Sequence, residues 1–133
     1  MTHPNQFPKN EKLCGEIRIS KLFAEGSAFI VYPIRMVYHF NDYTKESGVK
    51  VLIAVPKKKI RKAVDRNLLK RRIREAYRLN KGVIVDTMKT SEKSMELALT
   101  YVSDQIIDYK ELEKKVDIGL NRILKKIQKE ESE

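Results

Sequence analysis

Basic side chains are concentrated between residues 57 and 81, where twelve Lys and Arg residues stand against two acidic ones. The net charge of this segment, +10, equals the formal charge of the whole 133-residue chain, so the remaining residues are neutral in sum. Arg and Lys bind phosphate groups, and each phosphate that they neutralise releases bound counterions. This concentration of charge therefore predicts a surface for a polyanion such as a nucleic acid.

Residue types that could carry out catalysis in the protein itself are scattered along the sequence. His3 and His39 are far apart, Cys14 is the only cysteine, and the aspartates lack the spacing of metal ligands. The chain also has no glycine-rich phosphate loop. We therefore expect no catalytic residue, no metal site and no cofactor bound by the protein alone.

The basic residues fall on one side of a helix that we predict over residues 62–80, with Gly82 ending it. One broad sector of this helix is apolar and is expected to face a sheet: Val64, Leu68, Leu69, Ile73 and Ala76. The opposite side carries two polar rows: Lys62, Arg66, Lys70 and Arg74 in one, and Asn67, Arg71 and Arg78 in the other. Arg72 falls inside the apolar sector, so either the helix is rotated or this side chain reaches out from an edge.

The two polar rows weaken an isolated helix, because like charges four residues apart repel by roughly a few tenths of a kcal/mol per pair. A helix face that merely meets water normally mixes charges of both signs, whereas here only Glu75 lies near Arg71 and Arg78. The lysines at 57–59 would lie near the helix N-terminus, which itself favours anions. A polyanionic partner is therefore favoured over a purely solvated helix. A membrane is a poorer partner, because the apolar face is needed by the core and lacks Trp and Phe.

Apolar periodicity predicts the elements that precede this helix. Residues 16–25 are expected to form a helix that Gly26 ends, and the apolar run after it is split by Pro33 into an irregular or edge strand and a better strand over 34–40. In the latter, Ile34, Met36, Tyr38 and Phe40 alternate with Arg35, Val37 and His39. The next strand, 49–55, is apolar on both faces, which favours a central position, and the short loop before it favours antiparallel pairing with 34–40.

Beyond the basic helix, residues 83–95 are ambiguous between a helical extension and a loop, and residues 97–102 are expected to form another strand. Asp108 begins the sequence DYKE, which has the spacing of a capping box at the start of a final helix. The order of elements predicts an α/β (α+β) sandwich with a small mixed sheet of about four strands.

The length of the chain indicates one domain over residues 1–133, with flexible ends at 1–14 and 129–133. The N-terminus has no apolar signal core, and no run approaches the roughly 20 apolar residues of a membrane span. The lone Cys14 excludes an internal disulfide, which fits a reducing compartment. We therefore expect a cytoplasmic protein.

The basic helix and the turn before it resemble the protein subunit of bacterial ribonuclease P. The family's ordered pairs are matched by Lys57-Lys58, Ala63-Val64, Arg66-Asn67, Lys70-Arg71 and Arg74-Glu75. A generic basic helix would not reproduce these pairs at these offsets. The chain departs from the family at Leu68, where a third basic residue is frequent, at Arg72, where an apolar residue is usual, and at Ile19, where an aromatic is expected.

The resemblance implies an RNA-binding subunit that assists a catalytic RNA in removing the 5′ leader from precursor tRNA. It implies ribonuclease P RNA and precursor tRNA as partners, with Mg²⁺ in the holoenzyme, and neither DNA nor a membrane. The residues that it assigns to the catalytic RNA are Lys57, Lys58, Lys62, Arg66, Asn67, Lys70, Arg71, Arg74 and Arg78. Those that it assigns to the single-stranded leader, in a cleft between the first helix and the sheet, are Phe23, Arg35 and Tyr38. It also implies that the strand–helix–strand crossover around the basic helix is left-handed.

Two other classes of protein could carry such a helix. A non-enzymatic ribosomal or RNA-assembly (chaperone) protein would also dock on structured RNA, and only the order of the motif argues against it. A transcription regulator would place the helix in the major groove of DNA, yet a strand precedes the helix where a helix-turn-helix partner is needed. The aromatic residues Tyr38, Phe40 and Tyr101 are also candidates for the core rather than for RNA contacts.

Overall fold

A computed structural model describes residues 22–41, 48–90 and 94–131. Its elements are β1 (Ser27–Val31), β2 (Ile34–Asn41), β3 (Gly48–Ala54), α2 (Ala63–Asn80), α3 (Gly82–Thr90), β4 (Ser94–Tyr101) and α4 (Tyr109–Glu131). Of the helix expected over 16–25, residues 22–25 are described and are helical. Of the two ends that were expected to be flexible, residues 1–14 lie outside the described ranges, and residues 129–131 belong to the last helix.

The four strands form one sheet in the order β1-β2-β4-β3. β2 pairs with β1 and β4 in antiparallel fashion, while β3 pairs with β4 in parallel fashion. The expected direct pairing of strand 34–40 with strand 49–55 is therefore wrong, because β4 lies between them. The short loop between β2 and β3 reverses the chain direction, but it does not decide which strands become neighbours.

The strand over 49–55 was also expected to be central, and the structure places it at an edge of the sheet. Its two apolar faces have a different reason. One face, with Val49 and Val51, belongs to the main core, and on the other Leu52 packs against a small buried cluster of Leu22, Val37 and Ala98. Leu22 comes from the helical residues before β1. The second apolar face of β3 is therefore covered by the end of a helix, and it does not indicate a central position in the sheet.

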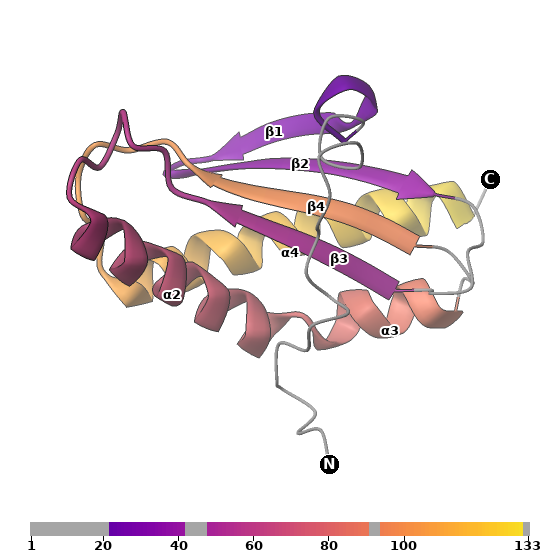
Figure 1. Ribbon diagram of the computed structural model, residues 1–133. Helices are drawn as coiled ribbons and strands as arrows, with labels where there is room; N and C mark the ends of the chain where they lie inside the picture. The colour runs from indigo at the N-terminus through magenta and orange to yellow at the C-terminus, as the bar shows by residue number, and fades with distance from the viewer. Residues whose placement is uncertain (1–21, 42–47, 91–93, 132–133) are drawn as a thin grey trace, which may run out of the picture.

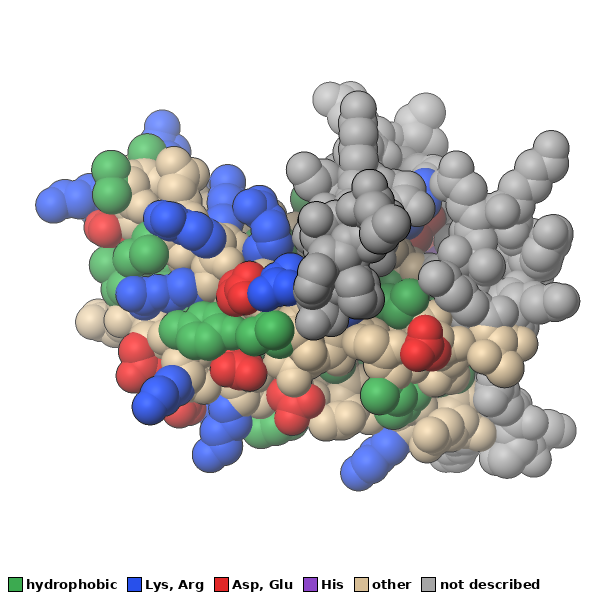
Figure 2. All heavy atoms as spheres, turned by 90° about the horizontal axis from the view of Figure 1, so that it is seen from below, with side chains coloured by type: hydrophobic (Ala, Val, Ile, Leu, Met, Phe, Trp, Pro, Cys, Tyr) green, Lys and Arg blue, Asp and Glu red, His purple; other side chains and the backbone are tan. Residues whose placement is uncertain are grey.

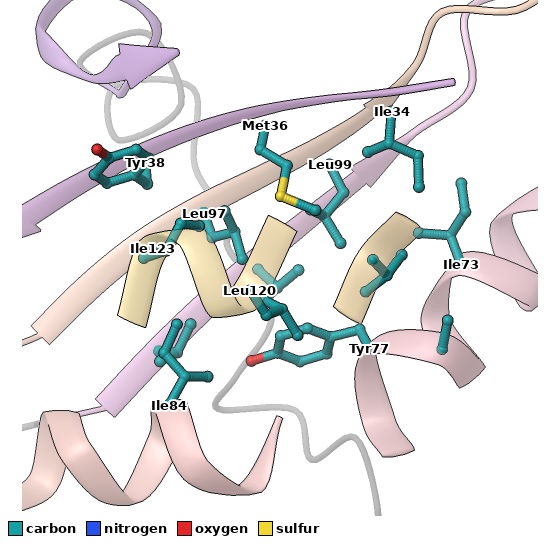
Figure 3. Packing of buried hydrophobic residues seen from close by; sticks show 14 of the residues in the cluster. Ile34, Met36, Tyr38, Ile73, Tyr77, Ile84, Leu97, Leu99, Leu120 and Ile123 are labelled. Atoms are coloured by element: carbon teal, nitrogen blue, oxygen red, sulfur yellow. The ribbon is translucent and has the colours of Figure 1, made fainter. Parts of the chain in front are cut away.

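Helices α2, α3 and α4 cover one face of the sheet, which confirms the α+β class (Figure 1). Met36, Leu97 and Leu99 of the sheet meet Leu120 and Ile123 of α4, and all five are at most 4% exposed (Figure 3). The parallel β3–β4 pair is joined through α2 and α3, so the expected strand–helix–strand crossover exists, and its hand stays a prediction.

The ends of the helices agree only in part with the sequence signals. Lys81 ends α2 in a right-handed conformation and Gly82 begins α3, so the role of Gly82 as a terminating glycine is wrong. The ambiguous segment after it is mostly helix. At the start of α4, the backbone N–H of Glu111 donates to Asp108 Oδ1 at 3.0 Å, which confirms the predicted N-cap.

The apolar side of α2 is rotated relative to the predicted sector. Leu69, Ile73 and Ala76 are fully buried as expected, but Val64 is 78% exposed, and Tyr77 is buried in addition. The first turn of α2 does not reach the core, where Ile60 of the preceding loop is buried instead. The prediction for Val64 is therefore wrong.

Candidate nucleic-acid interface

The surface that carries the excess charge begins with a turn directly after β3, which we call the lysine turn (residues 57–59). The backbone N–H groups of Lys59 and Ile60 both donate to the carbonyl of Pro56, at 3.1 and 3.2 Å. Ile60 is buried in the core, whereas the three lysines are exposed. The turn therefore projects three ammonium groups from a backbone that is held at both ends.

The N-terminus of α2 follows the lysine turn at once. Its N-cap residue, Lys62, has an extended backbone and makes no capping hydrogen bond through its side chain. The first N–H groups of a helix lack partners within the helix and carry partial positive charge. Lys62 and the lysine turn thus add full charges to an end of the helix that already attracts anions.

The outward side of α2 and the lysine turn together form what we call the basic surface. Lys62, Asn67, Arg71 and Arg74 are exposed on it, and Lys70 is half-buried. Arg71 and Arg74 have no hydrogen-bond or ion-pair partner among the residues that the structure describes. Lys and Arg side chains gather over the part of the molecule formed by α2 and become sparser over α3 (Figure 2).

Three other arginines of α2 are bound to the protein itself. Arg66 donates to the carbonyls of the loop before the helix. Arg72 donates to the carbonyl of Ile107 at 2.9 Å. Its side chain therefore reaches out from the edge of the apolar side, which was one of the two placements predicted for it. The guanidinium of Arg78 bonds to Glu75, with Nε and Oε2 3.0 Å apart, and this hydrogen bond lowers the pKa of the Glu75 carboxyl.

The residues predicted for the leader do not all lie on the same face of the sheet. Arg35 is exposed on the face that Leu22 covers, and Phe23, which adjoins Leu22, is 46% exposed. Tyr38 lies on the opposite face, is 8% exposed and packs edge-on against Phe29 and Phe40.

The structure therefore does not bring Tyr38 together with Phe23 and Arg35, and this grouping is wrong. Side chains alternate between the two faces of a strand, so residues 35 and 38 point in opposite directions. Tyr38 instead lines a hollow of about 200 Å³ on the side of α4, beside Arg122 and Lys126. The expected cleft also involves Ile19, which lies outside the described residues.

Two residues that the sequence did not single out are the neighbours of Arg35 across the sheet. Ile30 of β1 and Thr100 of β4 pair with it directly, and Ile30 is 57% exposed. Further along the same face, Nε2 of His39 lies 3.7 Å from Oε2 of Glu25, which belongs to the helical residues 22–25 before β1. Only the register of β4 against β2 reveals Thr100, and no local signal in the sequence gives that register.

Within the described ranges, no group of three His, Cys, Asp or Glu side chains is placed to hold a metal ion. The same residues include no helix long and apolar enough to cross a membrane. The chemistry that the described surface offers is thus the binding of anions by Lys and Arg, with apolar and aromatic side chains exposed on the sheet face.

Comparison with known proteins agrees with this arrangement. Residues 7–124 match the family model described as Ribonuclease P. The chain is 38% identical over 125 residues to the ribonuclease P protein component of Porphyromonas gingivalis, covering 92% of this chain and 91% of that protein. It is 35% identical over 83 residues to the corresponding protein of Chlorobaculum tepidum, covering 60% and 54% of the two chains.

The solved structures agree with the sequence relatives. The RNase P protein from Thermotoga maritima is 25% identical and superposes with a TM-score of 0.67, covering 84% of this chain and 96% of that one. The Staphylococcus aureus RNase P protein, at 17% identity and a TM-score of 0.63, shares the fold over 86% and 95% of the two chains.

The four-stranded mixed sheet with its basic helix is thus the fold of the ribonuclease P proteins. The chain belongs to the ribonuclease P protein family. It is an accessory protein subunit of ribonuclease P, an endoribonuclease that acts in tRNA processing.

Proposed function

We propose that the basic surface binds the RNA of ribonuclease P. The observation that carries this proposal is the exposure of Arg71 and Arg74, which have no partner among the described residues, beside the three exposed lysines of the lysine turn. Arginine suits phosphate because its planar fork donates two hydrogen bonds at once. Structured RNA presents phosphates in rows, and a row of cations along a helix is complementary to them.

We infer that the sheet face beside the helix end binds the single-stranded 5′ leader of precursor tRNA. Phe23 is 46% exposed, and Arg35, with Ile30 beside it, is exposed on the same side of the sheet. Aromatic rings stack on bases of any sequence, and basic side chains follow the backbone of a single strand. A leader needs this kind of tolerance, because its sequence differs from one precursor to the next.

Binding both RNAs would place positive charge between two polyanions. The protein would then screen the repulsion of their phosphates and reduce the Mg²⁺ concentration that cleavage requires. The catalytic metal ions would belong to the RNA, so the protein would contribute binding and orientation. Action on precursor tRNA would place the protein in the cytoplasm, where those transcripts are processed.

Reconstitution tests this function directly. The protein is combined with the ribonuclease P RNA of its source and a precursor tRNA, and leader release is measured over a range of Mg²⁺ concentrations. We expect faithful cleavage at low Mg²⁺ only when both protein and RNA are present, with RNA alone active at high Mg²⁺. RNA binding without stimulation of cleavage would instead support a ribosomal or RNA-assembly role.

A further inference from the structure

Arg66 donates hydrogen bonds to three successive carbonyls at the start of α2. Its Nη1 lies 3.0 Å from the carbonyl oxygen of Ile60 and 2.6 Å from that of Arg61. Its backbone N–H donates to the carbonyl of Lys62 at 3.0 Å, which is the first hydrogen bond of the helix. One residue thus fixes the whole segment that joins the lysine turn to α2.

These contacts complete the support of the lysine turn. The turn begins at the carbonyl of Pro56, which accepts the N–H groups of Lys59 and Ile60. It ends at Ile60, whose side chain is 4% exposed and whose carbonyl is held by Arg66. The side chains of residues 57–59 are exposed and make no hydrogen bond or ion pair with the described residues, so the backbone of the turn sets where these side chains leave the protein surface.

The geometry of Arg66 differs from that of the other cations on the basic surface. Its guanidinium turns back toward the loop, whereas Arg71 and Arg74 are exposed and lack a partner among the described residues. A hydrogen bond from a charged donor is stronger than a neutral one. Both contacts come from Nη1 of Arg66. Lysine could keep the charge, but its ammonium group sits on a flexible stem that ends one bond short of Nη1, so it does not hold both carbonyls in this geometry.

We propose that Arg66 is a positioning residue for RNA binding. It contributes to affinity by fixing the lysine turn relative to α2, so that residues 57–59 and the helix present their charges to the RNA as one rigid array. This proposal rests on the proposed function of the basic surface. It assigns to Arg66 an indirect role, in contrast to the direct phosphate contact that the motif suggests.

The first test uses the free protein and does not depend on RNA. Hydrogen exchange of the Lys59 and Ile60 amides is compared in the wild type, Arg66→Lys and Arg74→Lys. Because Arg66→Lys keeps the charge but loses the two carbonyl contacts, we expect exchange of these amides to accelerate about tenfold, as loss of a charged hydrogen bond implies. Arg74→Lys serves as the matched control and should leave both amides unchanged. Equal protection in the wild type and Arg66→Lys would overturn the proposal.

The second test is a double-mutant cycle that measures affinity for ribonuclease P RNA. It reports the coupling between Arg66 and the three lysines, which a role in stability alone would not produce. Arg66→Lys is measured alone and in a protein in which Lys57, Lys58 and Lys59 are all replaced by Gln. We expect Arg66→Lys alone to weaken RNA affinity roughly tenfold. If Arg66 acts through the lysine turn, this loss of affinity should fall to within about twofold once the three lysines are absent. Arg74→Gln, acting directly, should lose the same factor in both backgrounds.

The outcomes separate the two roles of Arg66 and the two proposals. An effect of Arg66→Lys that persists without the lysines would show a direct contact and refute positioning. If the wild type did not bind ribonuclease P RNA at all, the proposed function and the role of Arg66 in binding would both fail. The exchange measurement would still decide whether Arg66 holds the loop, so the two failures remain distinguishable.

Discussion

Replacing Arg71 and Arg74 together by Gln removes two exposed charges from the outward side of α2 and leaves the core untouched. Neither guanidinium has a partner among the described residues, so no protein contact is lost with them. Gln has nearly the helix propensity of Arg, and the helix should therefore remain intact. Any change in RNA affinity can then be assigned to lost contacts with phosphate.

The size of this change follows from counterion release. Each phosphate contact contributes roughly 0.7–0.9 to the slope of log affinity against log salt, so two contacts contribute about 1.6. A fourfold rise in salt, from about 50 to 200 mM, should therefore shrink the deficit of the double variant about ninefold relative to the wild type. The defect is expected to be large at low salt and small at high salt.

The assay is equilibrium binding to ribonuclease P RNA, followed by fluorescence anisotropy at several salt concentrations. The matched control replaces Lys114 and Lys125, two exposed lysines of α4, by Gln, which removes the same net charge from another helix. We expect the control to keep the slope of the wild type. Parallel slopes for the wild type and the Arg71/Arg74 variant would refute the assignment of α2 to the RNA.

Three further predictions address the other parts of the structure. Phe23→Ala should weaken binding of a precursor tRNA with a long leader by about 1–3 kcal/mol, the range for one base stack, and should leave a precursor with a one-nucleotide leader unaffected; equal losses would contradict leader stacking. Gly26→Ala should lower the free energy of unfolding by about 1–3 kcal/mol, because a Cβ there would lie 2.5 Å from the carbonyl oxygen of Leu22 and 2.9 Å from that of Tyr38; Gly82→Ala, which meets nothing within 4 Å, is the control and should be neutral or slightly stabilising in urea unfolding. Asp108→Ala should cost about 1 kcal/mol of stability through loss of the N-cap of α4, whereas Asp104→Ala, at an exposed residue of the preceding loop, should change the melting temperature little.

The sequence predicted the strands and helices of this fold better than the arrangement of the strands. Alternation and capping are local signals, and they located β2, β4 and the start of α4. The neighbours of β3 depend instead on β4, which is formed far along the chain, after two helices. Leu52 and Val51 made β3 look central, because apolar residues on both faces of a strand do not reveal whether a strand or a helix end covers them.

The basic surface could be predicted because its signal is density of charge, which does not depend on exact placement. The placement of individual side chains within this surface could not be predicted from the sequence. The start of α2 extends beyond the core, which exposes Val64, and the guanidinium of Arg66 turns toward the loop rather than outward. These placements depend on the direction in which α2 leaves the sheet, which the sequence does not reveal. The separation of Tyr38 from Arg35, in contrast, follows from the alternation of side chains along β2.

The stability of α2 explains how one helix can carry so many like charges. Lys62, Arg66, Lys70 and Arg74 form three repelling pairs at spacing four, which together cost about 1 kcal/mol. Burial of the fully enclosed Leu69 and Ile73 alone contributes about 3–6 kcal/mol, so packing against the core outweighs the repulsion. The helix is therefore formed before RNA arrives, and binding does not bear the cost of ordering it. It follows that the Arg71/Arg74 double variant should bind RNA more weakly while its free energy of unfolding stays equal or rises by a few tenths of a kcal/mol. A variant that lost RNA affinity and stability together would instead show that these arginines hold the fold.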